Sequence, residues 1–330
     1  MPPSNLAREE AGRQPPAAPT PALDDDQGDD IVAVPLRHPW RWVMAGLLVL
    51  CFVWLAASLW NNQNVDHATI AHYMFSSRIL HGALLTVVLT ALAMVLSTVL
   101  GVVLALMRLS SNPVLSALAW LYIWVFRGTP LLVQIVFWGY LGLLYKQIRL
   151  GVPFTSFTVF AADTNALIPA FVAGVIALTL NQAAYSAEIV RAGMLSVDPG
   201  QKEAAYSLGM TPMYTLMKVE LPQAMRVIIP PMGNETISML KDTALLSLIA
   251  VLELYTVAER ISAQNLRQVE LLVVVSCWYL ALTSILSVPQ YYLERHYGRG
   301  THLRGPTPIV RIVALVRGHS VARRPEAEPR

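Results

Sequence analysis

Long apolar runs separated by short polar stretches dominate the chain. Four runs, each close to or above the roughly 20 residues that cross a bilayer as a helix, lie at 40–60, 80–107, 167–194 and 269–289. Two more are interrupted: the run at 113–145 by Gly128 and Pro130, and the run at 234–254 by Lys241 and Asp242. The pattern predicts an all-α integral membrane protein with one span over 39–61 and five more within 75–297.

The composition agrees with this fold class. Hydrophobic residues make up 55% of the 330 residues and charged residues 14%, whereas soluble domains carry roughly 25% charged residues. The net charge of +3 is too small to indicate a nucleic-acid partner. Cys51 and Cys277 both lie inside apolar runs, so we expect neither a disulfide nor a metal site.

The two ends of the chain differ from the apolar middle. Residues 1–38 are rich in Pro and Ala and carry an acidic cluster, so we expect a disordered tail. Residues 298–330 are basic, and we expect a cytoplasmic tail there. Basic residues near the ends of the spans are more numerous on the inner side if the N-terminus is inside, which predicts a cytoplasmic N-terminus.

One polar, well-capped segment, residues 198–222, separates apolar runs in the second half of the chain. Asp198 precedes a proline and is a typical N-cap, and Gly209 suits the left-handed position that ends a helix. The pair Thr211-Pro212 repeats the start signal. We therefore predict two short helices at the membrane surface. The first would present a small-residue face to another protein, made by Glu203, Ala204, Ala205 and Leu208.

This segment resembles the coupling loop of permease subunits of ATP-binding-cassette (ABC) importers. The family pattern is Glu-Ala-Ala, a Gly four residues later, and Ile-x-Leu-Pro after nine more residues. Val219 replaces the usual Ile and keeps its shape and polarity. The residues that match the pattern, and that the resemblance assigns to coupling with an ATPase, are Glu203, Ala204, Ala205, Gly209, Leu221 and Pro222.

Three more segments are similar to the polar-amino-acid permeases of that class: 126–134, 184–191 and 241–245. Ala244 stands where the family often has Ser. The resemblance covers residues 75–297 and implies a type I ABC importer transmembrane domain with a five-helix core. The span at 39–61 is then an extra N-terminal helix.

The resemblance implies a permease subunit that imports a polar amino acid across the bacterial cytoplasmic membrane by alternating access. The sequence contains no G-x-x-x-x-G-K-[ST] loop, so we expect no ATP hydrolysis by this chain and no cofactor bound to it. ATP and Mg²⁺ would sit on a partner ATPase dimer beneath the coupling loop. The other implied partners are a second permease, identical or homologous, and an extracytoplasmic solute-binding protein.

A free amino acid carries an ammonium and a carboxylate, so its site needs both acceptors and donors. Polar groups at depth in a membrane line a cavity or pair with one another. The candidates for the substrate pathway are Asn181, Gln182, Lys241, Asp242 and Thr243. Alternatively, Lys241 and Asp242 form structural bridges to neighbouring helices. We expect a structural or gating role for Arg127, Glu188 and Arg191, of which the last two are spaced to pair on one helix face.

The residues are also compatible with other functions. The nearest is an ABC permease for another small solute, such as an opine or an organic cation. An ion-driven secondary transporter would show internal repeats, and the coupling loop would be unexplained. An intramembrane protease would need a paired nucleophile and base or an H-E-x-x-H motif, and the sequence lacks that motif.

Overall fold

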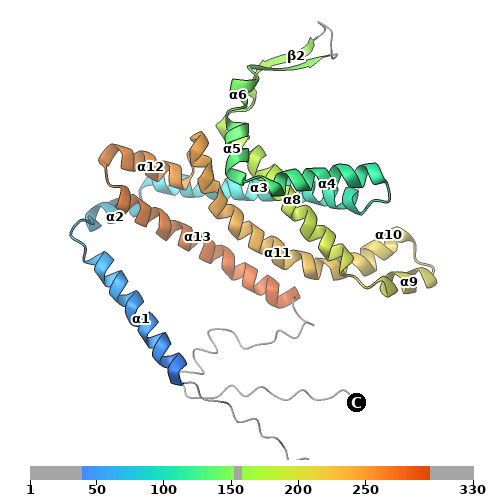
Figure 1. The fold of residues 1–330 in the computed structure, drawn as a ribbon, viewed down its shortest axis with the longest axis horizontal. Helices are drawn as coiled ribbons and strands as arrows, with labels where there is room; N and C mark the ends of the chain where they lie inside the picture. Colours follow the sequence, from blue (N-terminus) through green and yellow to red (C-terminus); the bar gives the residue numbers. More distant parts are fainter. Residues whose placement is uncertain (1–38, 152–157, 298–330) are drawn as a thin grey trace, which may run out of the picture. The chain divides into compact units, whose positions relative to one another are not determined.

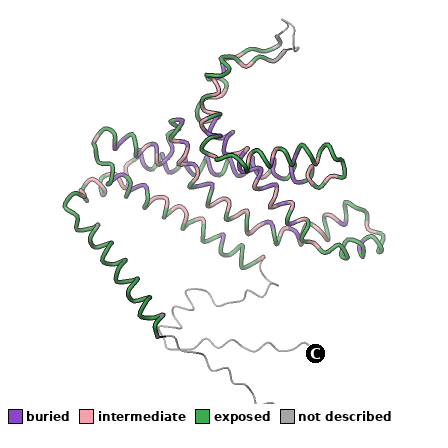
Figure 2. Tube along the Cα trace, in the orientation of Figure 1, coloured by how far each residue is buried: buried purple, intermediate pink, exposed green. Residues whose placement is uncertain are grey.

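The computed structural model describes residues 39–151 and 158–297. The tails expected over 1–38 and 298–330 lie outside the described residues. The chain forms two units, one ending at Asn62 and one beginning at Gln63. Among its described residues, the first unit contains one helix, α1 (Pro39–Trp60), where the extra span was predicted. Its described side chains are exposed on every side and mostly apolar, as on a helix that faces lipid (Figure 2).

The second unit is helical. Three of its described helices are long and apolar enough to cross a membrane: α3 (Ser77–Leu109), α8 (Ala170–Leu195) and α13 (Gln268–Tyr297). Another such segment is a bent pair, α4 (Pro113–Gly128) and α5 (Leu131–Gly139). These elements match four of the five apolar runs predicted for the core. The shorter helices around them are α2 (His67–Met74), α6 (Leu141–Leu144), α7 (Thr164–Leu167), α9 (Pro199–Ser207), α10 (Pro212–Thr215) and α12 (Leu254–Asn265).

The core of this unit forms where α3, α5, α8 and α11 (Leu221–Asp242) meet (Figure 1). Leu89, Ile135 and Leu178 are fully buried there. Gly101 lets α3 lie directly against α8, because a Cβ at this position would stand 3.1 Å from the Ala187 nitrogen. Many apolar side chains on the outside stay exposed, as expected of a surface that faces lipid.

The remaining predicted core span, the run at 234–254, begins earlier in the structure than the sequence indicated. We expected it to start at Asn234, after Pro230 and Pro231, whereas α11 starts at Leu221 and runs through both prolines. Each proline lacks the N–H that would bond to the carbonyl four residues earlier in the helix. At this point α11 is joined to α13, because the Gln290 Nε2 donates to the Pro230 carbonyl at 2.8 Å. The helix then continues as a 3-10 segment, η4 (Thr243–Ile249), which ends at the left-handed residue Ala250.

The region between α6 and α7 contains a small antiparallel hairpin. Its strands are β1 (Gln147–Gly151) and β2 (Thr158–Asp163), with Gln147 paired to Asp163. The register shifts between Leu150 and Gly151. Figure 1 shows that α5 and α6 carry this hairpin away from the other helices of the unit. The hairpin adds a minor β element to a helical fold.

Candidate functional site

The coupling segment folds as two short helices joined by a glycine turn. The Asp198 carboxylate accepts a hydrogen bond from the Gly200 nitrogen at 2.7 Å and caps α9. At the other end Gly209 has a φ of +77°, the left-handed conformation predicted from the sequence. The Gly209 nitrogen donates to the Tyr206 carbonyl at 2.9 Å, and the Met210 nitrogen donates to the Ala205 carbonyl at 3.1 Å. These two bonds make a Schellman motif.

The second short helix leads into α11 without a break. Thr211 caps α10, since its hydroxyl oxygen accepts from the Tyr214 nitrogen at 3.4 Å. A π-helical turn, η3 (Leu216–Glu220), then joins α10 to Leu221 and Pro222 in the first turn of α11. The Lys202 Nζ lies 3.5 Å from the Glu220 Oε1, so an ion pair ties α9 to the start of α11.

The small residues of this segment do not all face outward. Ala205 is only 4% exposed, whereas Glu203 and Ala204 are exposed and Leu208 is 83% exposed. Ala205 therefore supports the surface from below, and the expectation that both alanines share one contact face is wrong. We call the exposed set the coupling surface; it consists of Glu203, Ala204, Leu208, Met213, Tyr214 and Met217.

Between α4 and α5 the chain bends where the apolar run at 113–145 is interrupted, and polar side chains inside the unit bond to the backbone there. The two helices meet at 98° around Gly128 and Pro130. The Phe126 carbonyl, freed by the bend, accepts from the Asn181 Nδ2 at 3.1 Å and the Gln134 Nε2 at 3.0 Å. Gln134 also donates to the Thr129 hydroxyl at 2.7 Å and accepts from Asn181 at 3.2 Å. Asn181, a pathway candidate, is thus buried in the network that closes the bend.

The residues expected to be structural or gating make local contacts. The Arg127 guanidinium lies over the Tyr185 ring, with its carbon 5.1 Å from the ring centroid. This is a cation–π contact between α4 and α8. Glu188 and Arg191 form the predicted pair on one face of α8, with a shortest N–O distance of 2.8 Å.

A second polar cluster lies between α8 and α11. The Gln182 Nε2 donates to the Glu235 Oε2 at 3.0 Å, and both side chains are at least partly buried. Asp242 follows Glu235 by seven residues and so lies on the same face of α11. Lys241 beside it is exposed. Glu235 was missed by sequence reasoning, although its spacing from Asp242 was the signal that could have identified it.

The three pathway candidates on α11 and η4, Lys241, Asp242 and Thr243, differ in their contacts. Among the described residues neither Lys241 nor Asp242 forms an ion pair within 4.0 Å. The structural bridges considered as an alternative are therefore absent from that part of the chain. Thr243 is fully buried, and its hydroxyl donates to the Leu240 carbonyl at 2.8 Å. It stabilises the end of α11 and offers no free group to a solute in this conformation.

The sequence also gave no indication of a buried acid at the opposite end of the unit. Glu253 is fully buried and caps α12, accepting from the Tyr255 and Thr256 nitrogens at 2.9 and 2.7 Å. It also accepts from the Tyr279 hydroxyl at 2.9 Å, which ties α12 to α13. These donors satisfy the carboxylate, so its role is structural. No group of three His, Cys, Asp or Glu side chains suited to a metal ion occurs within the described ranges.

Comparisons with known proteins agree with this arrangement. Residues 97–299 match the family model described as binding-protein-dependent transport system inner membrane component. The arginine transport system permease protein ArgU of Corynebacterium glutamicum is 48% identical over 85% of this chain and 87% of its own length. The L-cystine transport system permease protein TcyB of Bacillus subtilis is 39% identical over 66% of this chain and 86% of its own length. The nopaline transport system permease protein NocM of Agrobacterium fabrum is 34% identical over 64% and 86%.

Solved structures show the same fold. A crystal structure of an amino acid ABC transporter with histidines matches 71% of this chain and all of its own chain, with a TM-score of 0.60 and 36% identity. A methionine ABC transporter, MetNI, matches 67% of this chain and 96% of its own chain with a TM-score of 0.51 at 17% identity, which shows the fold alone. The chain therefore belongs to the family of binding-protein-dependent transport system inner membrane components, as a multi-pass permease subunit of the amino-acid ABC importers of the cytoplasmic membrane.

Proposed function

We propose that this permease conducts a cationic amino acid, of which arginine is the model, along the face of α11 that carries Glu235 and Asp242. The observation that supports this most directly is the pair of carboxylates on one helix face, with no ion pair to either among the described residues. Acidic groups at membrane depth are costly unless a counter-charge joins them. A passing guanidinium or ammonium supplies that charge.

The neighbouring side chains fit the other end of such a substrate. Lys241 is exposed beside Asp242 and can attract the α-carboxylate. Gln182 holds Glu235 in place through the 3.0 Å hydrogen bond. A relative that is 48% identical is named for arginine transport, which supports the same chemistry.

The coupling surface, in this proposal, receives a partner ATPase dimer that holds ATP and Mg²⁺. Its large apolar side chains are exposed, with Leu208 83% and Met213 65% exposed, and exposed apolar patches of this kind are typical of protein–protein contact sites. A second permease, identical or homologous, completes the pathway, and a solute-binding protein delivers the amino acid to the opposite end. Closure of the ATPase pair then switches the access of the pathway from one side to the other.

Direct binding of radiolabelled arginine to the purified complex, without the solute-binding protein, tests the substrate assignment. Glu235→Gln and Asp242→Asn should each weaken binding by about ten-fold to a hundred-fold, because each removes a charge partner from a poorly solvated site. The matched control is Glu259→Gln, which removes an exposed carboxylate on α12 and should leave binding unchanged.

Competition between amino acids for binding tests the choice of a cationic substrate, and transport in liposomes tests the need for an ATPase. Unlabelled lysine should displace arginine, and glutamine and cystine should not. Equal competition by neutral amino acids, or unchanged arginine binding in both acid variants, would remove the carboxylates from the pathway. Accumulation of arginine in liposomes by the permease alone, with no ATPase present, would contradict the assignment of the coupling surface.

A further inference from the structure

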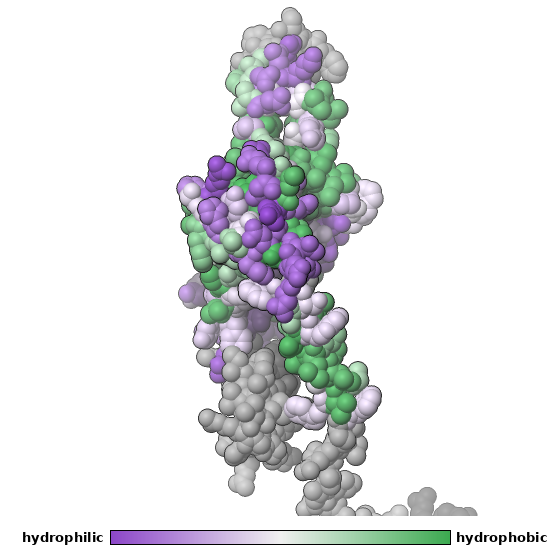
Figure 3. Space-filling view, turned by 90° about the vertical axis from the view of Figure 1, so that its left-hand side faces the viewer, coloured by the Kyte–Doolittle hydropathy of each residue, from purple (hydrophilic) through white to green (hydrophobic). Residues whose placement is uncertain are grey.

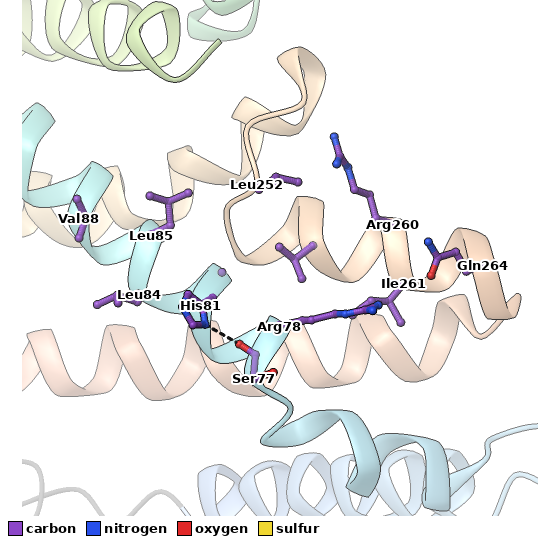
Figure 4. A pocket seen from close by; sticks show the side chains of 12 residues that line it. Ser77, Arg78, His81, Leu84, Leu85, Val88, Leu252, Arg260, Ile261 and Gln264 are labelled. Carbon is purple, nitrogen blue, oxygen red and sulfur yellow. Dashed lines mark hydrogen bonds between the residues drawn. The ribbon is translucent and has the colours of Figure 1, made fainter. Parts of the chain in front are cut away.

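A large cavity lies at the end of the second unit opposite the coupling loop, between the start of α3 and α12 (Figure 4). Its volume is about 700 Å³, which is large enough for a small organic molecule or part of a lipid. It belongs neither to the polar cluster of α8 and α11 nor to the coupling surface. The residues that line it are Ser77, Arg78, His81, Gly82, Leu84, Leu85, Val88, Leu252, Val257, Arg260, Ile261 and Gln264.

The rim of the cavity is cationic. Arg78 on α3 and Arg260 on α12 are both exposed, and neither forms an ion pair among the described residues. His81 donates from its Nδ1 to the Ser77 carbonyl at 3.1 Å, which leaves its Nε2 available. The lining contains no Asp or Glu. The surface at this end is rich in polar side chains, as at the level of lipid headgroups (Figure 3).

The body of the cavity is apolar and open to the side. Leu84, Val88 and Leu252 are 61%, 44% and 46% exposed although they are aliphatic. Val88 lies about 16 Å along the helix from Ser77, close to the depth of one leaflet of a hydrocarbon core about 30 Å thick. The cavity is thus charged where headgroups lie and apolar where acyl chains lie.

We propose that this cavity binds one anionic phospholipid. Its phosphodiester lies between Arg78 and Arg260, and one acyl chain follows Leu84, Val88 and Leu252. A free amino acid does not fit this lining, since the lining offers no carboxylate to the ammonium. The lipid joins α3 to α12, the helix that follows the end of α11 and η4. It therefore stabilises the end of the unit opposite the coupling loop.

Native mass spectrometry of the complete importer, with bound lipids counted after exchange, tests the site. Phosphatidylglycerol should be retained in preference to phosphatidylethanolamine. The double variant Arg78→Gln/Arg260→Gln should bind phosphatidylglycerol about thirty-fold more weakly, as two cationic contacts near the surface are lost. The matched control, Lys146→Gln/Arg149→Gln, removes the same charge from the hairpin region and should retain the lipid.

A second variant tests the acyl-chain half without touching the charges. Val88→Trp fills the apolar body and should release the lipid while the melting temperature of the delipidated complex stays unchanged. Millimolar inorganic phosphate or arginine should not displace the lipid. Equal retention by the arginine variant and its control, equal binding of the zwitterionic lipid, or displacement by arginine would each overturn the proposal.

Discussion

The coupling segment and the bend between α4 and α5 both interrupt helices with Gly and Pro, but the protein stabilises them in opposite ways. At the coupling segment the backbone closes the turn itself, through the left-handed Gly209 and two local hydrogen bonds. At the bend the free carbonyl of Phe126 is satisfied by side chains from elsewhere, Gln134 on α5 and Asn181 on α8. An exposed break needs only correct local conformation, whereas a break inside the bundle needs polar partners from the tertiary structure.

The largest expected effect comes from Gly209→Pro. Proline fixes φ near −65° and cannot adopt the +77° that the turn requires, so uptake should fall to background while the chain still inserts. Gly209→Asn is the matched control, because Asn tolerates the left-handed region, and it should transport normally. Uptake by the reconstituted importer measures both. Normal transport by the proline variant would contradict the coupling assignment.

Next in size is Glu203→Lys, which changes the coupling surface without touching the fold. Its side chain is exposed, so stability should change by less than about 0.5 kcal/mol. Substrate-stimulated ATP hydrolysis should drop by about ten-fold or more, because reversing a contact charge creates repulsion. Glu259→Lys, at the other end of the unit, is the control and should keep its activity. An unchanged ATPase rate in Glu203→Lys would exclude this residue from the contact.

Substitutions at the bend between α4 and α5 should instead lower the stability of the protein. Gln134→Leu removes the donor to both Phe126 and Thr129 and should destabilise the protein by about 2–3 kcal/mol. Asn181→Leu should lower the free energy of unfolding by about 1–2 kcal/mol, because Gln134 still donates to the Phe126 carbonyl. The loss in the double variant should differ from the sum of the two single losses, as expected for one network. Additive losses in thermal unfolding would show that the two side chains act independently.

The smallest expected effect separates the two alanines of the coupling segment. Ala205→Leu places bulk at a position only 4% exposed and should cost about 1–3 kcal/mol of stability. Ala204→Leu is exposed and should leave stability within about 0.5 kcal/mol while weakening the contact with the ATPase. Melting temperature and ATPase binding, measured on both variants, distinguish these outcomes. Equal melting temperatures would place Ala205 on the surface.

The same contrast explains what the sequence could predict. The caps at Asp198, Thr211 and Gly209 are local, so residue type and spacing were sufficient to place them. The passage of α11 through Pro230 was not predictable, because α13, which packs against α11 and bonds to it through Gln290, lies 60 residues away along the chain. For the same reason Asn181 could be recognised as a buried polar residue but not as the partner of Phe126, 55 residues earlier.

The candidate site was also predictable where it depends on local spacing and not where it depends on packing between helices. The motif residues of the coupling segment follow a fixed spacing along the chain, and the structure adds only which of them face outward. The polar cluster depends on packing between α8 and α11. The spacing of Glu235 from Asp242 could place both on one helix face, but not the hydrogen bond from Gln182. Glu253 gave no signal, since its donor Tyr279 lies on a different helix.

The ion pair between Lys202 and Glu220 has a mechanical consequence. It fastens α9 to the residue that precedes α11, and α11 is a rod about 33 Å long whose far end carries Lys241 and Asp242. A force applied at α9 thus acts on the same rod that bears those charged side chains. Tilting this rod changes the distance of Lys241 and Asp242 from the helices around them.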